Sequence, residues 1–331
     1  MHVTLVHYQK ADFPEIFWLK RLLPGISVQQ IEDLSQTKVF PGSIVISKWL
    51  GSLRSDLLNM IAATPGVVLF HISDEWYLDP WDRYRCFVHV IRNYHHPFLR
   101  QEGITQIPIG PSRDPSRAHE MRSVTERSYI WSFAGNLAST RRSLVNHLSS
   151  LKPNFIHISG AGTRKQNLLN PEQYLGILGD SVFVPCPMGN VNLETFRLYE
   201  ALDSGAIPIV ERRHWLDYFT ELFGPHPLPS VRNWMEAPAL INSLRSDRVR
   251  LCDKQIEIRE WWQRLEKRIS TEVTSIISRA TAQKARMTFA PSAPSRLSGI
   301  CEMLKHHNAT ALWARSQLTI RRLWAAGLRM S

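Results

Sequence analysis

Short apolar runs alternate along the chain with longer segments whose apolar residues recur every three to four positions. The apolar runs predict strands at residues 3–8, 43–47, 66–72, 87–91 and 105–109. Segments 12–23 and 52–63 have helical periodicity, and a Pro-Gly pair follows each of them. Strands separated by helices are typical of parallel sheets with both faces covered. The first third of the chain is therefore predicted to be an α/β unit.

The alternation stops at residues 110–127, which begin with turn-forming glycine, proline and serine residues, and then resumes. The second series predicts strands at 129–134, 154–159, 181–184 and 206–210, and helices at 139–148, after Asn170-Pro171, at 194–204, 233–244 and 247–279. A segment with Pro291 and Pro294 follows and predicts a flexible connection. We therefore expect three parts: residues 1–112, residues 128–279, and a tail at 280–331.

The net charge of +11 arises from 40 Lys and Arg against 29 Asp and Glu, and it suggests an anionic partner. The charge is unevenly distributed, because residues 280–331 hold eight basic residues and one acidic residue. The tail therefore carries +7, and the rest of the chain only +4. This weak charge on the body, without a recognisable nucleic-acid motif, argues against nucleic-acid binding as the main function.

The four cysteines, Cys86, Cys186, Cys252 and Cys301, are far apart and match no zinc-binding spacing. Their arrangement favours a reduced, cytoplasmic protein. The first residues lack a basic stretch followed by a long apolar run, so no signal peptide is expected. No run of about 18 apolar residues occurs, so no transmembrane helix is expected either.

The segment from residue 183 to residue 210 contains the strongest indication of chemistry. A buried strand is predicted to end at Pro185-Cys186-Pro187, a loop with Gly189 follows, and a helix begins near Glu194-Thr195. Unpaired N–H groups and the helix dipole make such a helix N-terminus a binding site for anions.

Arg197 and Glu200 lie three residues apart in this predicted helix and share one face. This arrangement suits a nucleoside diphosphate, with the arginine at a phosphate and the glutamate accepting hydrogen bonds from ribose hydroxyls. The alternative is an ordinary ion pair on the surface of the helix, which is the commoner arrangement in an arbitrary helix. The preceding loop and the position at the end of a strand favour the binding site.

The same segment resembles the exostosin-like glycosyltransferase family. Members have a C-P-x-G loop, a helix with S/T-x-R-L-x-E-A-L, and a small-residue turn with I-P-V-I. The corresponding sequences here are C-P-M-G at 186–189, T-F-R-L-Y-E-A-L at 195–202 and G-A-I-P-I-V at 205–210. The sequences at 71–76 and 131–136 are similar to the same family, so the resemblance covers residues 67–210.

This resemblance implies the GT-B fold, in which two Rossmann-like domains face each other across a cleft. Residues 1–112 would then bind the acceptor, and residues 128–279 a nucleotide-sugar, which we expect to be a UDP-sugar. The resemblance also implies that Arg141 or Arg142 neutralises the donor diphosphate. For either arginine singly, an exposed position on the helix is an equally good interpretation. The predicted donor-binding residues are Arg141, Arg142, Gly189, Thr195, Arg197 and Glu200.

Asp74 and Glu75 follow the most apolar predicted strand, and the strand ends are where open α/β sheets bind ligands. Either is a candidate catalytic base for the acceptor hydroxyl, and capping a short helix is the alternative role for Asp74. His95 and His96 are candidate acceptor contacts. Adjacent histidines in a turn without a third ligand do not suggest a metal site. His71, inside the strand, is expected to be a hydrogen-bonded core residue.

In the tail, residues 312–329 place apolar side chains, two tryptophans among them, on one side of a predicted helix. Arg315, Arg322 and Arg329 lie on the other side. Such a basic amphipathic helix suits an anionic membrane surface. Docking onto the protein itself or onto a second subunit is an equally good interpretation.

The sequence as a whole predicts a glycosyltransferase that moves a sugar from a nucleotide-sugar to a glycan or a lipid-linked acceptor, as in polysaccharide biosynthesis. We expect it to need no bound metal or other cofactor, and to lie in the cytoplasm with peripheral membrane contact through the tail. Two alternatives remain. One is an inactive GT-B partner subunit that binds nucleotide weakly and transfers nothing, and the other is a basic nucleic-acid-binding protein.

Overall fold

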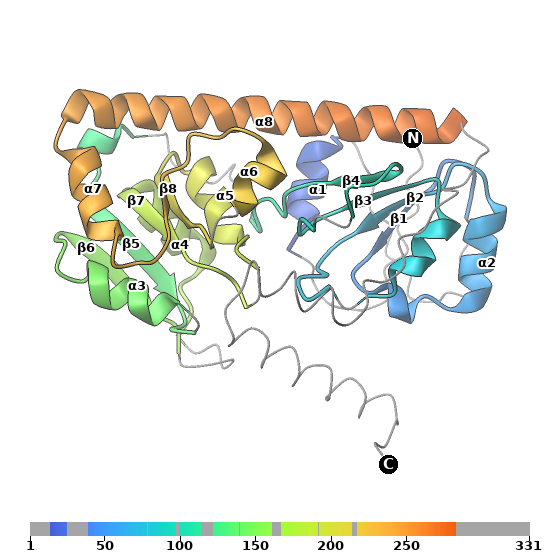
Figure 1. Cartoon of the computed structure of the whole chain (residues 1–331), viewed down its shortest axis with the longest axis horizontal. Helices are drawn as coiled ribbons and strands as arrows, with labels where there is room; N and C mark the ends of the chain where they lie inside the picture. The colour runs from blue at the N-terminus through green and yellow to red at the C-terminus, as the bar shows by residue number, and fades with distance from the viewer. Residues whose placement is uncertain are drawn as a thin grey trace, which may run out of the picture.

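A computed structural model of the chain describes residues 14–24, 39–77, 79–96, 99–113, 122–138, 140–160, 167–190, 192–213 and 217–282. These residues form two parallel β-sheets, each with its own helices, that lie side by side (Figure 1). A long helix, α8 (Arg248–Ala282), runs along both of them (Figure 1). The predicted α/β architecture is confirmed.

The first sheet has the order β1-β2-β3-β4, and every neighbouring pair is parallel. Its strands are β1 (Ile44–Ser47), β2 (Val68–His71), β3 (His89–Arg92) and β4 (Ile104–Gln106), and its helices are α1 (Ile16–Leu22) and α2 (Ser55–Ala63). All residues of β1 and β2 are buried, which explains their unbroken apolar sequences. The strand predicted at residues 3–8 lies outside the described residues.

The second sheet has the order β6-β5-β7-β8-β9, again with all neighbours parallel. Its strands are β5 (Tyr129–Gly135), β6 (Asn154–Ile158), β7 (Ser181–Cys186), β8 (Ile207–Glu211) and β9 (Ser230–Val231). Its helices are α3 (Arg141–Leu148), α4 (Pro171–Gly179), α5 (Phe196–Asp203), α6 (Tyr218–Phe223) and α7 (Ala237–Arg245). Asn170 caps α4 as predicted, in a reciprocal capping box with Gln173.

From the sequence, helix α8 was predicted to belong only to the second series, and the structure differs from this prediction. In the structure it also packs against α1 of the first series. Trp262 stacks on Trp18 at 5.7 Å between ring centroids, and Ser270 Oγ donates to the Leu22 carbonyl at 2.9 Å. Arg21 binds both Glu266 of α8 and Asp203 of α5 at 2.6 Å. One continuous hydrophobic core accordingly contains buried residues from both sheets and from α8.

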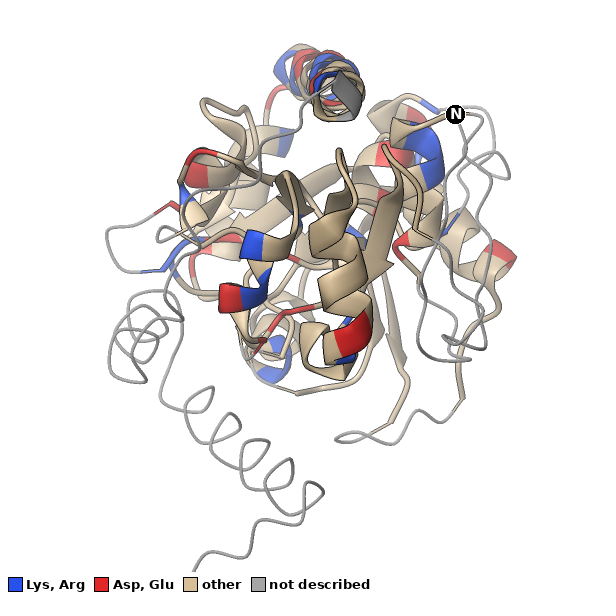
Figure 2. Ribbon diagram, turned by 90° about the vertical axis from the view of Figure 1, so that its right-hand side faces the viewer, with Lys and Arg blue, Asp and Glu red and all other residues tan. Residues whose placement is uncertain are grey.

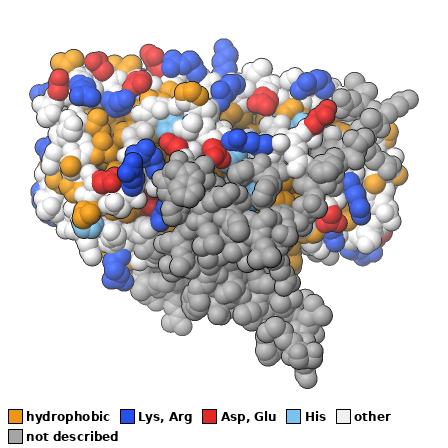
Figure 3. Space-filling model, viewed as in Figure 1, with side chains coloured by type: hydrophobic (Ala, Val, Ile, Leu, Met, Phe, Trp, Pro, Cys, Tyr) orange, Lys and Arg blue, Asp and Glu red, His pale blue; other side chains and the backbone are white. Residues whose placement is uncertain are grey.

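Charged residues of both signs are interspersed on the surface. Seen end-on in Figure 2, α8 carries Lys and Arg next to Asp and Glu. The face in Figure 3 likewise shows small, separate basic and acidic groups among the described side chains. No helix in the described ranges is long and apolar enough to cross a bilayer. The amphipathic segment at 312–329 lies outside those ranges.

Candidate functional site

The carboxyl ends of β5 and β6 and the start of α5 surround a pocket of about 470 Å³. Four of the predicted donor residues line it: Arg141, Thr195, Arg197 and Glu200. The other lining residues are Pro14, Ser112, Arg113, Ala134, Gly135, His157, Ser159, Leu168, Leu169, Tyr174 and Phe196. The pocket thus lies where a parallel sheet is expected to bind its ligand. Arg141 belongs to α3, Arg197 and Glu200 belong to α5, and Thr195 directly precedes α5, so the structure brings together residues from two separate parts of the second series.

Arg197, in the first turn of α5, points back toward the end of β5. Its guanidinium lies 4.7 Å from the ring centre of Phe133, and Nη2 donates to the Ala134 carbonyl. Its Nε is buried without a hydrogen-bond partner. Within the described part of the chain Arg197 has no carboxylate partner, so the ordinary ion pair with Glu200 is not formed.

Arg141 is the first residue of α3 and is the second cation of the pocket. Nη1 donates to Asn136 Oδ1 at 2.5 Å, and Nη2 donates to the Met188 carbonyl at 3.4 Å. Burial lowers its pKa to about 10, and the nearby charge of Arg197 acts in the same direction. Two partly buried cations that repel each other are stabilised when an anion binds between them. Arg142 is exposed and does not line the pocket.

Glu200 is buried, with 3% of its surface exposed, and accepts several hydrogen bonds. Tyr174 donates its hydroxyl to Oε2 at 3.0 Å, and burial beside this carboxylate raises the tyrosine pKa. Glu200 Oε1 accepts one hydrogen bond from the Ser112 hydroxyl and one from the Arg113 guanidinium at 3.1 Å. Ser112 and Arg113 belong to the segment between the two sheets, which the sequence treated only as a linker.

Thr195 precedes α5 in an extended conformation, and its side chain makes no capping bond. Its Oγ1 is buried and, among the residues described, bonds to no other group. A buried hydroxyl without a partner is unfavourable, so its position in the pocket suits a polar ligand.

Glu75 joins the first sheet to the glycine loop of the second. Its Oε1 accepts from the Asn190 N–H at 2.9 Å and from the Asn192 N–H at 3.4 Å, and Oε2 accepts from the Asn190 side chain at 3.1 Å. A Cβ on Gly189 would lie 2.7 Å from Glu75 Oε1, so only glycine allows this approach. The negative charge of Glu75 also favours the charged form of Arg141.

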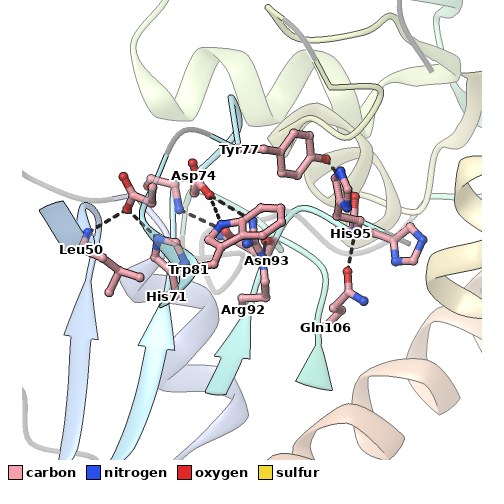
Figure 4. A network of polar contacts seen from close by, with 12 residues as sticks. Leu50, His71, Asp74, Tyr77, Trp81, Arg92, Asn93, His95 and Gln106 are labelled. Atoms are coloured by element: carbon pink, nitrogen blue, oxygen red, sulfur yellow. Dashed lines mark hydrogen bonds and ion pairs between the residues drawn. The ribbon is translucent and has the colours of Figure 1, made fainter. Parts of the chain in front are cut away.

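Asp74 lies in a buried network beside this contact rather than in the pocket (Figure 4). Its Oδ2 accepts from Trp81 Nε1 at 3.1 Å and pairs with Arg92 at 3.4 Å. Residues after β2 form a turn, so the helix-capping alternative for Asp74 is wrong. His71 is fully buried between Tyr84 and Asp79, at 2.6 and 2.8 Å, as predicted for a core histidine.

His95 and His96 are buried away from the pocket. His95 Nε2 bonds Glu221 Oε2 at 2.9 Å, and its N–H donates to the Tyr218 hydroxyl at 3.0 Å, which ties the first sheet to α6. His96 packs edge-on against Tyr77 and Trp81. In this structure the two predicted acceptor contacts are buried and do not line the pocket.

Sequence reasoning missed two buried carboxylates. Glu211, at the end of β8, accepts from Trp234 at 2.7 Å and pairs with Arg213 at 2.6 Å. Glu194 accepts from the Ile109 N–H at 2.7 Å, the Tyr218 hydroxyl at 2.9 Å and the Tyr199 hydroxyl. Each of these glutamates directly follows an apolar residue at the end of a strand or a loop. This position was the only indication in the sequence that the carboxylates are buried. Among the residues described, no group of three or more His, Cys, Asp or Glu is arranged to hold a metal.

The family model described as the RXYLT1 C-terminal domain matches residues 112–281. The chain belongs to this family. The matched range includes Ser112, Arg113, Arg141, Arg197 and Glu200, so every lining residue of the pocket except Pro14 lies within it.

Among curated proteins, the chain is 24% identical over 233 residues to ribitol-5-phosphate xylosyltransferase 1 of Mus musculus, covering 62% of this chain and 52% of that protein. It is 23% identical over 255 residues to the Danio rerio protein of the same name, and the match covers 70% of this chain and 58% of that protein. The chain therefore spans about half the length of the curated relatives it matches.

Two solved structures have a similar fold. An α1,3-fucosyltransferase matches with a TM-score of 0.52 and 15% identity, covering 83% of this chain and 90% of that one. Anabaena Alr3699/HepE in complex with UDP and glucose matches with a TM-score of 0.54 and 11% identity, covering 84% and 100%. At such low identity these matches establish the fold alone. That fold is GT-B, as the sequence predicted.

Proposed function

We propose that this chain is a glycosyltransferase that takes a sugar from a UDP-sugar bound in the 470 Å³ pocket. One observation carries the proposal: Arg141 and Arg197, both without a bonded carboxylate among the described residues, lie in one pocket with the buried carboxylate of Glu200. The cations suit a diphosphate, and the carboxylate suits the hydroxyls of a ribose. Relatives named as xylosyltransferases support transfer of a sugar.

In the proposed reaction, an acceptor oxygen attacks the anomeric carbon of the donor sugar, and the bond from that carbon to the diphosphate breaks. Charge then develops on the leaving UDP. Arg141, Arg197 and the N-terminal end of α5 stabilise it, because they are already oriented toward the pocket. In our proposal these groups, and not a resident metal ion, stabilise the leaving UDP.

Glu75 is the proposed base that takes the proton from the acceptor hydroxyl. It lies at the contact between the two halves of the molecule, against Gly189 and near Arg141. Asp74 is less suited to this role, because its carboxylate is buried against the Arg92 guanidinium. Both were candidates from the sequence, and the different partners of the two carboxylates favour Glu75.

The names of the relatives suggest which substrates to test first. The name ribitol-5-phosphate xylosyltransferase points to a xylose donor, which we propose to be UDP-xylose, and to an acceptor that contains ribitol 5-phosphate. We also propose that the motif shared with exostosin-like enzymes reflects the same use of Arg197 and Glu200. Peripheral attachment through residues 312–329 at the cytoplasmic face of a membrane remains part of this proposal.

Binding of UDP measured by calorimetry tests the site. We expect Arg197→Ala and Glu200→Ala each to weaken UDP binding by about tenfold or more, as for loss of a hydrogen bond to a charged group. The thermal unfolding of both variants should remain a single cooperative transition. Wild-type affinity in both variants would show that the assignment of the pocket is wrong.

A further inference from the structure

The segment that connects the two sheets is attached to α5 and its N-terminal flank at two points. Near β4, the Ile109 N–H donates to Glu194 Oε1 at 2.7 Å, in a fully buried bond. Further along, Ser112 and Arg113 bind Glu200, which lies six residues after Glu194. Between the two points, Gly110 has a φ of +66° and lies so close to the Trp18 ring that no Cβ fits. The path of the connection before Ser112 is therefore tightly constrained.

The second attachment uses the carboxylate that we propose for the ribose. The Ser112 hydroxyl and the Arg113 guanidinium both donate to Oε1 of Glu200, and Tyr174 donates to Oε2. One carboxylate oxygen has two lone pairs in the plane of the group, so Oε1 is fully occupied. A ribose hydroxyl reaches Oε1 only when one of these donors leaves.

We propose that Ser112 and Arg113 form a displaceable internal ligand of the donor site, with the Ser112 hydroxyl taking the position of a ribose hydroxyl in the empty enzyme. This inference rests on the proposed function, because it takes Glu200 as the ribose-binding residue. Donor binding exchanges the Ser112 hydroxyl for a sugar hydroxyl on the same carboxylate. The bond from Ile109 to Glu194 stays in place, so the displacement involves Ser112 and Arg113 and does not extend back to β4.

The contacts of the two residues fit an exchange rather than a permanent structural bond. The Arg113 side chain is 37% exposed, so water screens its ion pair with Glu200. Its guanidinium also lies 4.9 Å from the ring centre of Tyr174, a contact that does not depend on Glu200. Ser112 loses one hydrogen bond and regains one with water, which costs little. By contrast, the Ile109 bond is buried and has no substitute.

The test compares UDP affinity in Ser112→Ala with the wild type by calorimetry on the full chain. Removing the competing hydroxyl should tighten UDP binding by about threefold to tenfold, the factor for one net hydrogen bond. Ser112→Thr keeps the competing hydroxyl and should not show this tightening. Arg122→Ala is a matched control in the same connection, because Arg122 pairs with Asp180 at the surface, outside the pocket.

A double-mutant cycle adds a second criterion. If Ser112 acts through Glu200, Ser112→Ala should have no effect on UDP affinity in a Glu200→Ala background. Suppose that the wild type binds UDP and that Glu200→Ala binds it weakly. Unchanged or weaker UDP binding by Ser112→Ala then overturns the proposal of an internal ligand and leaves the proposed function intact. Absence of UDP binding in the wild type and in all variants refutes both.

Discussion

Arg141 and Arg142 are neighbours in the sequence, yet their surroundings differ. Arg141 lines the pocket and lies near Arg197, whereas Arg142 is exposed on α3. We expect Arg141→Ala to weaken UDP binding by about tenfold to a hundredfold, because a charge-assisted bond to phosphate is lost. Arg142→Ala is the matched control and should change affinity by less than about twofold. Equal effects of the two substitutions, measured by calorimetry at one ionic strength, would contradict the assignment.

The sequence could not decide between these two arginines, because adjacent positions of a helix point in directions about 100° apart and the orientation of α3 depends on packing. The same limit applies to Asp74 and Glu75. Their sequence position showed that both follow β2, but only the fold shows that Arg92 approaches Asp74 and Asn190 approaches Glu75. The sequence shows that charged side chains occupy these positions. It does not show which residues, distant in the sequence, bind them.

Glu200 illustrates the limit most clearly. Its shared face with Arg197 followed from their spacing, and both residues do line the pocket. Its ionic partner is instead Arg113, which is 87 positions away in a segment without secondary-structure signals. A pattern of three-residue spacing contains no information on such a contact.

At the scale of elements, the loop between β7 and α5 depends on Gly189. An alanine there would place its Cβ 2.7 Å from Glu75 Oε1, and the flexible end of Glu75 would have to move. We expect Gly189→Ala to lower kcat for sugar transfer about tenfold or more, since a displaced base loses much of its effect. The Tm should change by less than about 3 °C, because a side chain can yield without moving the backbone.

Gly179→Ala is the matched control for this experiment. Apart from its chain neighbours and the backbone of α4 itself, no described atom lies within 4 Å of the Cβ that it would introduce at the end of α4. Turnover by the Gly179 variant should equal that of the wild type, measured at saturating donor. Wild-type turnover by Gly189→Ala as well would show that the contact between Glu75 and the loop has no part in the reaction.

Most elements were predictable because β1, β2 and β7 are short, largely apolar runs and the long helix α8 is amphipathic. The structure adds the 3₁₀ helix Trp81–Cys86, α6 and the two-residue strand β9. Each is short, and its sequence lacks a clear period. Helix α6 is stabilised by tertiary contacts, such as the hydrogen bond from Tyr218 to Glu194, more than by the helix propensity of its own residues.

At the scale of the whole molecule, α8 joins the two halves in a way that its sequence period does not reveal. Its apolar stripe predicted a buried face, but the stripe contains no indication of which sheet covers it. Arg21 of α1, bonded to both Glu266 and Asp203, belongs to the first half and binds acidic residues of the second. Together with the pair of His95 and Glu221, this contact fixes the halves next to each other.

Glu194 lies at the same junction and leads to a prediction for the pH dependence of stability. Its carboxyl group is buried among the Ile109 N–H and the hydroxyls of Tyr199 and Tyr218, and burial raises its pKa to about 7. In the unfolded chain the pKa returns to the ordinary value near 4.5. Between these values the folded protein binds more protons than the unfolded one. The contribution of Glu194 to stability therefore falls as the pH rises from about 4.5 to about 7.

Glu194→Gln isolates this contribution from that of the rest of the protein. The amide keeps an oxygen that accepts from Ile109 and Tyr199, and it is neutral at every pH. We expect the Tm of the variant, relative to the wild type, to increase steadily from pH 5 to pH 8, because only the wild type must bury a carboxylate at high pH. Thermal unfolding of both proteins across this range is the measurement. A difference in Tm that stays constant, or that shrinks toward pH 8, would show that Glu194 titrates normally in the folded protein.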